Sequence, residues 1–591
     1  MKEFHVSKLL DPEPPRSGLM NELWAIQLRD GFISDENIQS LAKRFGLSFV
    51  EIEGVVTFYH FFQKKPTGKH VIYLNNSIAA EFKGYERIKE AFERETGATL
   101  GSVDRTGTFG LFNTPCIGLS DQEPSALIDF FPFNHLNVIK VKEIVNQLRQ
   151  GATADSMYSV PDDNIRYLPP NNGSIFFNEF KTSESLENAF RLGDEGVISE
   201  LKKSVLAGRG GAFFPAWLKW DSARKQKATP KYVVCNADEG EPGTFKDRVL
   251  MNNQAASMIE GMIIGGFTIG AAYGIIYLRG EYRWLKKKLE DTIDQYYKKS
   301  LLGKDAGGIT GFNFDMRIQM GAGAYVCGEE TALLESMEGK RGEPRTKWFF
   351  PVERGYLQKP TIINNVETFC AVARIIAMGS DAYCKRGIPG SPGTKVLSVS
   401  GDCRLPGIYE IDWGMTVAEL LELCEADDPY YIQLSGPSGE CISVKEKYKR
   451  ISMLNLPGQN DIRCGGAFMI FNHHRDLTQV LLNYAEFFKH ESCGICTPCR
   501  AGNFILERKL EKLKNGLAVA DDLEDLKNWG NIMKASSRCG LGKTAPNSIV
   551  QSMERFREYF DAKLYKGKNE DGSLSAFNLE GAIADYEKYK S

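Results

Sequence analysis

The sequence has no excess of charge of either sign, because 73 lysine and arginine residues stand against 76 aspartate and glutamate residues. Proteins whose main partner is a nucleic acid carry a strong basic balance, and a net charge of −3 argues against that class. The chain also begins without an apolar run, since MKEFHVSKLLDPEPP is charged from its second residue. We therefore expect no nucleic-acid partner, no secretory leader and a cytoplasmic location.

Disulfides are also not expected. Without a secretory leader, the 13 cysteines are predicted to be reduced thiols and metal ligands. Those that stand singly between the motifs are predicted to be buried, small apolar residues. They are Cys235, Cys327, Cys370, Cys384, Cys403, Cys424, Cys441 and Cys464.

One apolar run, residues 255–278, is long enough to raise the question of a membrane span, and its only charge is Glu260. Glycines crowd the run, and it ends in the strand-like residues YGIIYL. We predict a buried helix that leads into a buried strand, and no membrane span.

A glycine-rich stretch, SVLAGRGGAFFPAWLKW at residues 204–220, is a candidate phosphate cradle. Gly208, Gly210 and Gly211 surround Arg209, and Lys219 follows. Backbone amides without a neighbouring Cβ, together with an arginine, suit a phosphate or pyrophosphate. The stretch matches neither the dinucleotide fingerprint G-x-G-x-x-G nor a P-loop, and a plain turn is the alternative.

The strongest local signal is a cysteine motif. Cys493, Cys496 and Cys499 follow the spacing C-x2-C-x2-C, which puts three thiolates on one tight loop. This spacing is typical of a [4Fe–4S] cluster, and a structural zinc site is the alternative. Position 503, where a two-cluster ferredoxin has its fourth cysteine, is an asparagine. The fourth ligand must therefore come from elsewhere in the chain.

Four further sequence motifs lie between these two. They are CNADEGEPGTFKDR at 235–248, YLRGE at 277–281, GAGAYVCGEETALLESMEGKRGEPR at 321–345 and KPTIINNVET at 359–368. In this order they resemble the 51 kDa flavoprotein family, the FMN- and NADH-binding subunit of respiratory NADH dehydrogenase. The resemblance covers about residues 175–560. With its additional N-terminal segment, the chain is most similar to the diaphorase subunit of NAD-reducing soluble nickel–iron hydrogenases. These flavoprotein motifs favour an iron–sulfur cluster over zinc at the cysteine motif.

The N-terminal part, residues 1–165, is predicted to be a helical segment followed by a small α/β unit. It resembles the 24 kDa subunit of NADH dehydrogenase, a thioredoxin-like ferredoxin that holds a [2Fe–2S] cluster with four cysteines. Those four positions fall here on Asn75, Ala80, Cys116 and Ser120. Asparagine and alanine cannot replace thiolates, and His70 is the only histidine nearby. We therefore expect a domain that has lost its cluster, and no [2Fe–2S] group.

The rest of the chain is predicted to form an α/β multidomain protein. Residues 151–175 have the composition of an interdomain linker. An FMN- and NAD(H)-binding α/β domain is expected over 176–390, and a β-grasp-like domain over 395–475. Residues 476–591 contain four amphipathic segments, which predict a four-helix bundle that carries the iron–sulfur cluster, and a tail that is loose or wraps a neighbour.

The resemblance also implies which residues hold the cofactors. FMN would be lined by the glycine stretch and Lys219, and by Asn236, Asp238, Glu239, Gly328, Glu329, Glu330, Asn364, Asn365 and Thr368. NAD(H) would lie over the flavin against Phe214, Glu241, Tyr325, Glu330 and Phe350, with Glu330 as the candidate catalytic residue. For Asn365, helix capping is the alternative role. Cys539 is implied as the fourth cluster ligand.

Two positions depart from the family pattern. Phe213 replaces a glycine, and Ser222 replaces an aromatic residue that helps to hold adenine. Acidic residues near the ribose fit NAD better than NADP, whose 2′-phosphate they would repel.

The implied function is that of a diaphorase subunit. Hydride would pass between NAD(H) and FMN, and single electrons through the [4Fe–4S] cluster to or from a hydrogenase module; the fold need only align the cofactors. The implied partners are a ferredoxin-like iron–sulfur subunit and hydrogenase subunits in a hetero-oligomer. The alternatives are the flavin subunit of NAD-dependent formate dehydrogenase or of respiratory complex I, and a catalytically silent electron-transfer scaffold.

Overall fold

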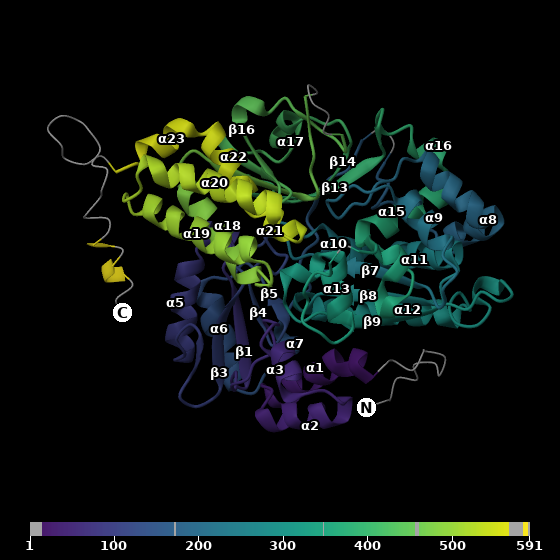
Figure 1. The fold of residues 1–591 in the computed structure, drawn as a ribbon, viewed down its shortest axis with the longest axis horizontal. Helices are drawn as coiled ribbons and strands as arrows, with labels where there is room; N and C mark the ends of the chain where they lie inside the picture. The colour runs from purple at the N-terminus through teal and green to yellow at the C-terminus, as the bar shows by residue number, and fades with distance from the viewer. Residues whose placement is uncertain are drawn as a thin grey trace.

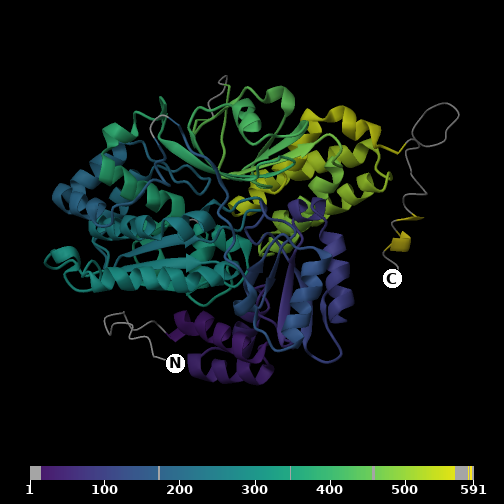
Figure 2. The ribbon, with the colours of Figure 1, turned by 180° about the vertical axis from the view of Figure 1, so that it is seen from behind.

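The computed structural model describes residues 15–170, 173–346, 348–454, 460–565, 583–584 and 586–588. Three sheets, each covered by helices, organise successive parts of the chain (Figures 1 and 2). The N-terminal helices and the first sheet lie on one side of the molecule. The central sheet, the third sheet and the C-terminal helices follow in colour order from teal to yellow.

The N-terminal region has the predicted order of helices followed by a small sheet. Ser34 and Ser48 begin α2 and α3 with capping boxes, in which each hydroxyl accepts from the N3 amide. The sheet order is β2-β3-β1-β4-β5, with β1 and β3 parallel. The elements are α1 (Leu19–Asp30), α2 (Asp35–Phe45), α3 (Phe49–Val56), β1 (His70–Asn75), α4 (Ile78–Phe82), α5 (Tyr85–Thr96), β2 (Ser102–Val103), β3 (Phe109–Thr114), β4 (Ala126–Ile128), β5 (Phe131–Phe133), α6 (Val138–Arg149) and α7 (Ala154–Met157).

The central region is built on a four-stranded parallel sheet of order β10-β7-β8-β9. Its strands are β7 (Tyr232–Ala237), β8 (Tyr273–Leu278), β9 (Asp315–Met320) and β10 (Thr361–Asn365). Its helices are α8 (Glu184–Lys203), α9 (Ala216–Arg224), α10 (Lys246–Asn253), α11 (Ala255–Ile269), α12 (Lys286–Lys298), α13 (Glu330–Met337), α14 (Pro351–Arg354), α15 (Val366–Met378) and α16 (Ser380–Tyr383).

The apolar run at 255–278 forms the predicted buried helix and strand, α11 and β8. Its glycines permit close packing, since a Cβ at Gly261 would lie 2.1 Å from the carbonyl oxygen of Phe369 on α15. Among the described residues, no helix combines the length and apolarity that a membrane crossing requires.

The third region is a six-stranded sheet of order β16-β15-β19-β13-β14-β6. The predicted strand, strand, helix, strand pattern corresponds to β13 (Thr394–Gly401), β14 (Gly407–Asp412), α17 (Val417–Leu423) and β19 (Ala467–Asn472). Sequence reasoning missed β15 (Pro429–Leu434) and β16 (Glu440–Ser443). It was also wrong that the segment 151–175 is only a linker, because β6 (Ile165–Tyr167) pairs in parallel with β14 as the edge strand.

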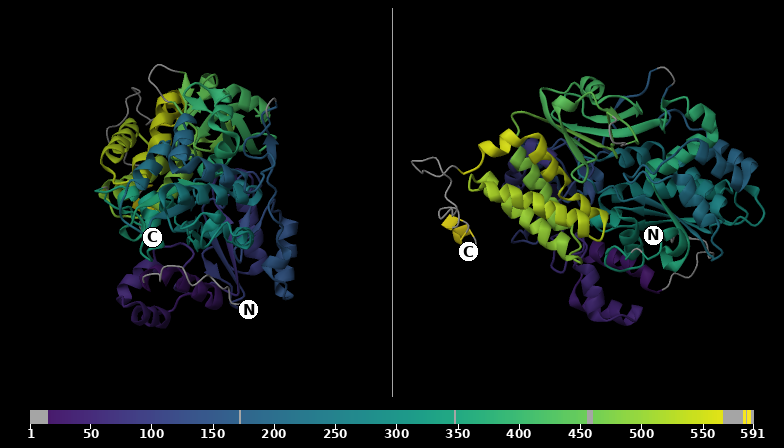
Figure 3. Two further views of the ribbon diagram at one scale, coloured as in Figure 1. Left: turned by 90° about the vertical axis from the view of Figure 1, so that its right-hand side faces the viewer. Right: turned by 45° about the horizontal axis from the view of Figure 1, so that its top comes forward.

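The C-terminal helices pack together beside the six-stranded sheet (Figure 3). They are α18 (Leu477–Glu491), α19 (Thr497–Lys514), α20 (Ala520–Ser536), α21 (Gly540–Thr544), α22 (Asn547–Arg555) and α23 (Arg557–Ala562). The fourth predicted segment is divided at Phe556, whose backbone leaves the helical region at φ −122°. The prediction for the tail beyond residue 567 falls almost entirely outside the described residues.

Candidate functional site

The glycine stretch forms a loop between α8 and α9 that lies against the N-terminal end of α15. The amide of Arg209 donates to Thr368 Oγ1 at 2.9 Å. A Cβ on Gly210 would lie 3.3 Å from Asn365 Cβ, and Gly211 has a φ of +101°, which favours glycine. Loops that follow β7 and β10 meet this stretch at the carboxyl edge of the parallel sheet, where ligands of open α/β sheets bind.

Arg209 is fully buried. One guanidinium nitrogen donates to the Tyr383 hydroxyl at 2.7 Å, and the guanidinium carbon lies 5.1 Å from the ring centroid of Trp413. The other two nitrogens, Nε and Nη1, are buried without a protein partner among the described residues. This leaves unpaired donors beneath the loop, a costly arrangement unless an anion or water meets them.

Several predicted cofactor residues are brought together from distant parts of the chain. Lys219 Nζ donates to Ile363 O at 3.0 Å and lies 3.2 Å from Glu330 Oε2. Asn236 Nδ2 donates to the carbonyl of Gly328 at 2.9 Å. The loops after β7, before α13 and at the end of β10 therefore face one another across this edge.

Other predicted cofactor residues have structural hydrogen bonds. Glu329 caps α13, accepting from the amides of Thr331 and Ala332 at 2.9 Å each. The amide oxygen of Asn364 accepts from the Trp220 indole at 2.9 Å. The capping alternative for Asn365 is confirmed, since its side chain accepts from the Glu367 amide at 3.0 Å. Their contact with FMN stays a prediction.

The three acidic residues of the DEGE motif have raised pKa values; Glu239 is buried, and Asp238 and Glu241 are half-buried. Burial raises the pKa of Asp238 well above its usual range, and its Oδ2 has no protein partner among the described residues. Burial also raises the pKa of Glu239 and of Glu241 to about 7. Glu239 accepts from the Tyr282 hydroxyl at 2.9 Å and from the first amides of α10, so its carboxylate orients that helix.

Glu241 is held between two regions of the chain. It accepts from the Ser438 amide at 2.8 Å and from the hydroxyl of Tyr325. The amide of Tyr325 donates in turn to Glu491 at 2.7 Å. The predicted NAD(H) residues Glu241 and Tyr325 therefore link the six-stranded sheet, the central region and α18.

Aromatic side chains are exposed near the site. The predicted adenine contacts Phe214 and Phe350 are 49% and 65% exposed, and sequence reasoning overlooked their neighbour Trp348, which is 82% exposed. The consecutive aromatics at 348–350 were the available signal. Ser222 lies on α9. Phe213 adopts a φ of +53°, a conformation in which a glycine carries no strain, and its ring packs against Trp413.

A buried charge network also escaped sequence reasoning. Lys246 Nζ lies 2.6 Å from Asp247 Oδ1, 3.1 Å from Glu367 Oε2 and 3.2 Å from Asn365 Oδ1. Lys395, from β13, forms an ion pair with the same Glu367. The only sequence signal for Lys246 is its place in the FKDR motif, which is weak. The sequence around Lys395 carries no signal for this network, because its partner Glu367 lies in a different domain.

The four predicted cluster cysteines converge where the α18–α19 loop meets the start of α21. Cys499 and Cys539 are buried. Burial raises the pKa of Cys499 to about 12, and the other three thiols add to this effect. Asn503, at the position of a ferredoxin's fourth cysteine, places its amide nitrogen 3.4 Å from Cys499 Sγ.

The four positions at which the 24 kDa family has cysteines have other contacts here. Asn75 donates to Glu123 and accepts from the Ser77 amide at 2.9 Å. Cys116 Sγ lies 3.4 Å from Ser120 Oγ, and Ala80 is buried in α4.

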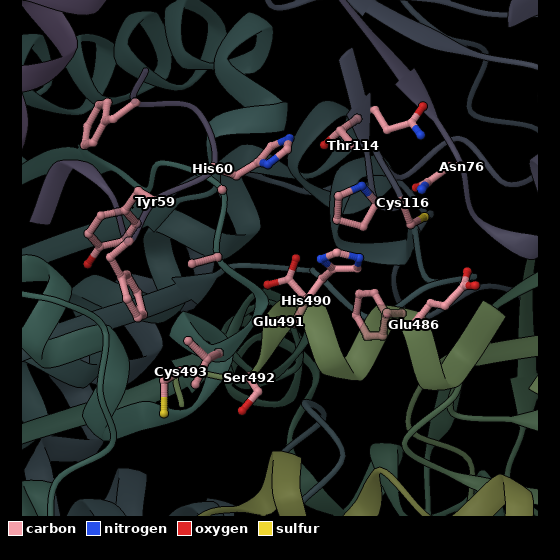
Figure 4. Close-up of a pocket in the computed structure, with 18 of the residues that line it drawn as sticks. Tyr59, His60, Asn76, Thr114, Cys116, Glu486, His490, Glu491, Ser492 and Cys493 are labelled. Atoms are coloured by element: carbon pink, nitrogen blue, oxygen red, sulfur yellow. The ribbon is translucent and has the colours of Figure 1, made fainter. Parts of the chain in front are cut away.

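A cavity of about 910 Å³ lies between Cys116 and the end of α18 (Figure 4). Cys116 and Thr114 line it on one side, and His490, Glu491 and Cys493 line it on the other. The glycine stretch does not contribute to its wall. The cavity is therefore separate from the predicted FMN cradle.

The prediction that the single cysteines are buried holds for most of them. It is wrong for Cys384, which is exposed, and for Cys403, which is half-buried. Cys384 follows the short helix α16 and therefore lies near the surface.

Comparison with known proteins gives three family matches. Residues 201–374 match the Nuo51 FMN-binding domain, residues 8–149 the thioredoxin-like [2Fe–2S] ferredoxin, and residues 479–563 the NADH-ubiquinone oxidoreductase-F iron–sulfur binding region. The thioredoxin-like, FMN-binding and iron–sulfur parts of the predicted fold are thereby confirmed.

Individual relatives extend the comparison to the whole chain. The chain is 46% identical to the NAD-reducing hydrogenase HoxS subunit alpha of Cupriavidus necator, over 97% of this chain and 96% of that protein. It is 36% identical to the mitochondrial NADH dehydrogenase [ubiquinone] flavoprotein 1 of Dictyostelium discoideum, over 64% of this chain and 81% of that protein. The crystal structure of an NAD⁺-reducing [NiFe]-hydrogenase in the H₂-reduced state matches with a TM-score of 0.87 and 31% identity, over 97% of this chain and 96% of that one.

The respiratory flavoprotein is thus similar over about two thirds of the chain, whereas the hydrogenase protein is similar from end to end. The chain belongs to the family of NAD-reducing hydrogenase alpha subunits, the fused form of the NADH dehydrogenase flavoprotein family.

Proposed function

We propose that the chain is the diaphorase subunit of a hydrogen:NAD⁺ oxidoreductase, an NAD(H)-dependent enzyme. The observation that carries the proposal is the meeting of the predicted flavin loops at the carboxyl edge of the parallel sheet, next to the four-cysteine site. The end-to-end likeness to the hydrogenase protein supports hydrogenase as the partner over formate dehydrogenase or complex I. The chain retains each of the flavoprotein motifs, and this argues against a catalytically silent scaffold.

The glycine loop fits FMN. Gly211 has open space beside it, since a Cβ there would meet no described atom within 4 Å. The unpaired donors of Arg209 and the first amides of α15 favour an anion at this place. Bound FMN would accept hydride from NADH and release its electrons singly to a cluster.

The protein's own residues would bind and align. Lys219, held by Ile363 O and Glu330, would face the flavin, and Asn236 would be oriented by Gly328. Glu330, on the first turn of α13, would lie beside the nicotinamide. Glu241 and Tyr325 would hold the dinucleotide, and Phe214 and Phe350 would stack on adenine. Because hydride passes between the cofactors, no protein acid or base is required for the transfer itself.

The four-cysteine site fits a [4Fe–4S] cluster. Burial raises the pKa of the Cys539 and Cys493 thiols, and the backbone amides of Leu541 and Gly542, and of Ile495, oppose this rise. We also infer that the N-terminal domain carries no [2Fe–2S] cluster, although its family model is that of a [2Fe–2S] ferredoxin. Asn75, Ala80 and Ser120 supply no thiolate, and Asn75 is already bonded to Glu123.

We further infer the domain limits 1–165, 176–390, 395–475 and 476–591, with the third domain β-grasp-like and the fourth a helical bundle. Strand β6, within 151–175, belongs with the third domain by its pairing. A ferredoxin-like iron–sulfur subunit and hydrogenase subunits are the proposed partners, and the cytoplasm is the proposed location.

The test is a visible and EPR spectrum of the purified chain reconstituted with FMN, iron and sulfide, before and after NADH. We expect stoichiometric FMN that bleaches with NADH, one cubane cluster and no [2Fe–2S] signal. A [2Fe–2S] signal that disappears in Cys116→Ser would refute the loss of the N-terminal cluster. Failure of bound flavin to bleach would refute the diaphorase assignment.

A further inference from the structure

The charge network behind the glycine loop is buried. Three cations, Arg209, Lys246 and Lys395, and two carboxylates, Asp247 and Glu367, are each at least 98% buried. A third carboxylate, Glu239, is 6% exposed and acts on Lys246 and Asp247, and burial raises its pKa to about 7. Burying ions is costly unless their charges are balanced, and the network has an excess of one positive charge only while Glu239 is protonated.

Hydrogen bonds connect this network to the loop. Lys246 Nζ lies 3.2 Å from the Asn365 side chain, which caps α15 and packs against Gly210. Asn365 also donates to Asp247 Oδ2 at 2.6 Å. The buried cation Lys246 thus lies directly behind the amides that we assign to the FMN phosphate.

Lys395 is the member of the network that a second domain supplies. It extends from β13 of the six-stranded sheet and pairs with Glu367 on α15. The charged and titratable groups that face it are Glu367, Lys246, Arg209 and the Cys464 thiol. Burial, with the neighbouring charges of Lys246 and Arg209, lowers the pKa of Lys395 to about 8, and Glu367 offsets this only in part.

We propose that Lys395 is a positioning residue for the FMN phosphate, acting through Glu367, Lys246 and Asn365, so that the phosphate completes a buried charge network shared by two domains. This inference rests on the proposed function, in which FMN occupies the loop. A bound phosphate dianion stabilises the ammonium form of Lys395, and FMN binding therefore takes up a proton wherever free Lys395 is neutral. The sign follows from linkage: FMN affinity falls as the pH rises above about 8.

The experiment measures the Kd of FMN for the full chain by quenching of flavin fluorescence at pH 7, 8 and 9. We expect the wild-type Kd to rise between pH 8 and pH 9 by up to about tenfold, the limit for one proton per pH unit. Riboflavin, which is FMN without the phosphate, should bind without this slope.

Two variants test the residue itself. Lys395→Arg stays charged throughout the range, so it should keep FMN affinity at pH 7 within a few-fold and lose the slope. Lys395→Met with Glu367→Gln removes both charges and avoids a lone buried carboxylate. It should bind FMN more weakly at pH 7, without the slope. Lys509→Arg, which changes an ion-paired lysine of α19, is the matched control and should behave as the wild type.

The outcomes separate the two proposals. If wild-type protein binds no FMN at any pH, the proposed function and this inference both fail. If FMN binds stoichiometrically but the slope is absent, persists in Lys395→Arg, or is equal for riboflavin, this inference alone fails.

Discussion

Replacing Gly210 by alanine tests the cradle most directly. The new methyl group would lie 3.3 Å from Asn365 Cβ, closer than the optimal carbon–carbon contact of about 3.5–4.0 Å, so Asn365 must move. Asn365 bonds to Asp247 at 2.6 Å and to Lys246 at 3.2 Å. Hydrogen bonds to charged groups each contribute about 1.5–3 kcal/mol. If the displaced loop loses one such bond to the charged FMN phosphate, FMN binding weakens about tenfold to a hundredfold.

Gly54→Ala, on helix α3 and outside the predicted cofactor site, is the control for this experiment. Its methyl group would meet no described atom closer than Arg341 Cδ at 3.9 Å, an ordinary contact. We therefore expect the Kd of FMN, measured by fluorescence titration at pH 7, to rise in Gly210→Ala and to stay near the wild-type value in Gly54→Ala. Equal affinities in the two variants would refute the placement of the phosphate beside Asn365.

Three further predictions address the cluster, the dinucleotide and stability. Cys539→Ala should lose the cubane EPR signal but keep NADH oxidation with an artificial dye, because flavin can reduce a dye directly; loss of FMN as well would make the cluster a folding element. Phe350→Ala, 65% exposed in the wild type, should raise the KM for NADH about tenfold with little change in kcat, since it removes uniform binding; a kcat effect alone would contradict its role. Burial raises the pKa of Glu123 to about 8, so the folded state binds a proton that the unfolded state releases above its ordinary pKa of about 4.5. Wild-type stability should therefore fall from pH 5 to pH 8 relative to Glu123→Gln in denaturation experiments, and parallel pH profiles would show that Glu123 does not titrate in this way.

The local sequence determined much of this fold. The run at 255–278 predicted α11 and β8 because a continuous apolar pattern needs burial on all sides. Ser34 and Ser48 marked helix starts through capping, which depends on residues three positions apart. Cys493, Cys496 and Cys499 predict a metal site by their spacing alone.

Interactions between distant residues were decided only by the tertiary structure. β6 has an exposed edge and no periodic pattern of its own, and it is a strand because β14 offers it hydrogen bonds. Glu239 and Asn364, predicted to reach the cofactor, have their side chains bonded to α10 and Trp220. Lys395 and Glu367 share no sequence motif. They form an ion pair only because two domains pack against each other. Sequence motifs reflect geometry between residues that are close in the chain. The balance of buried charge depends instead on which distant side chains packing brings together, and no short stretch of sequence shows that.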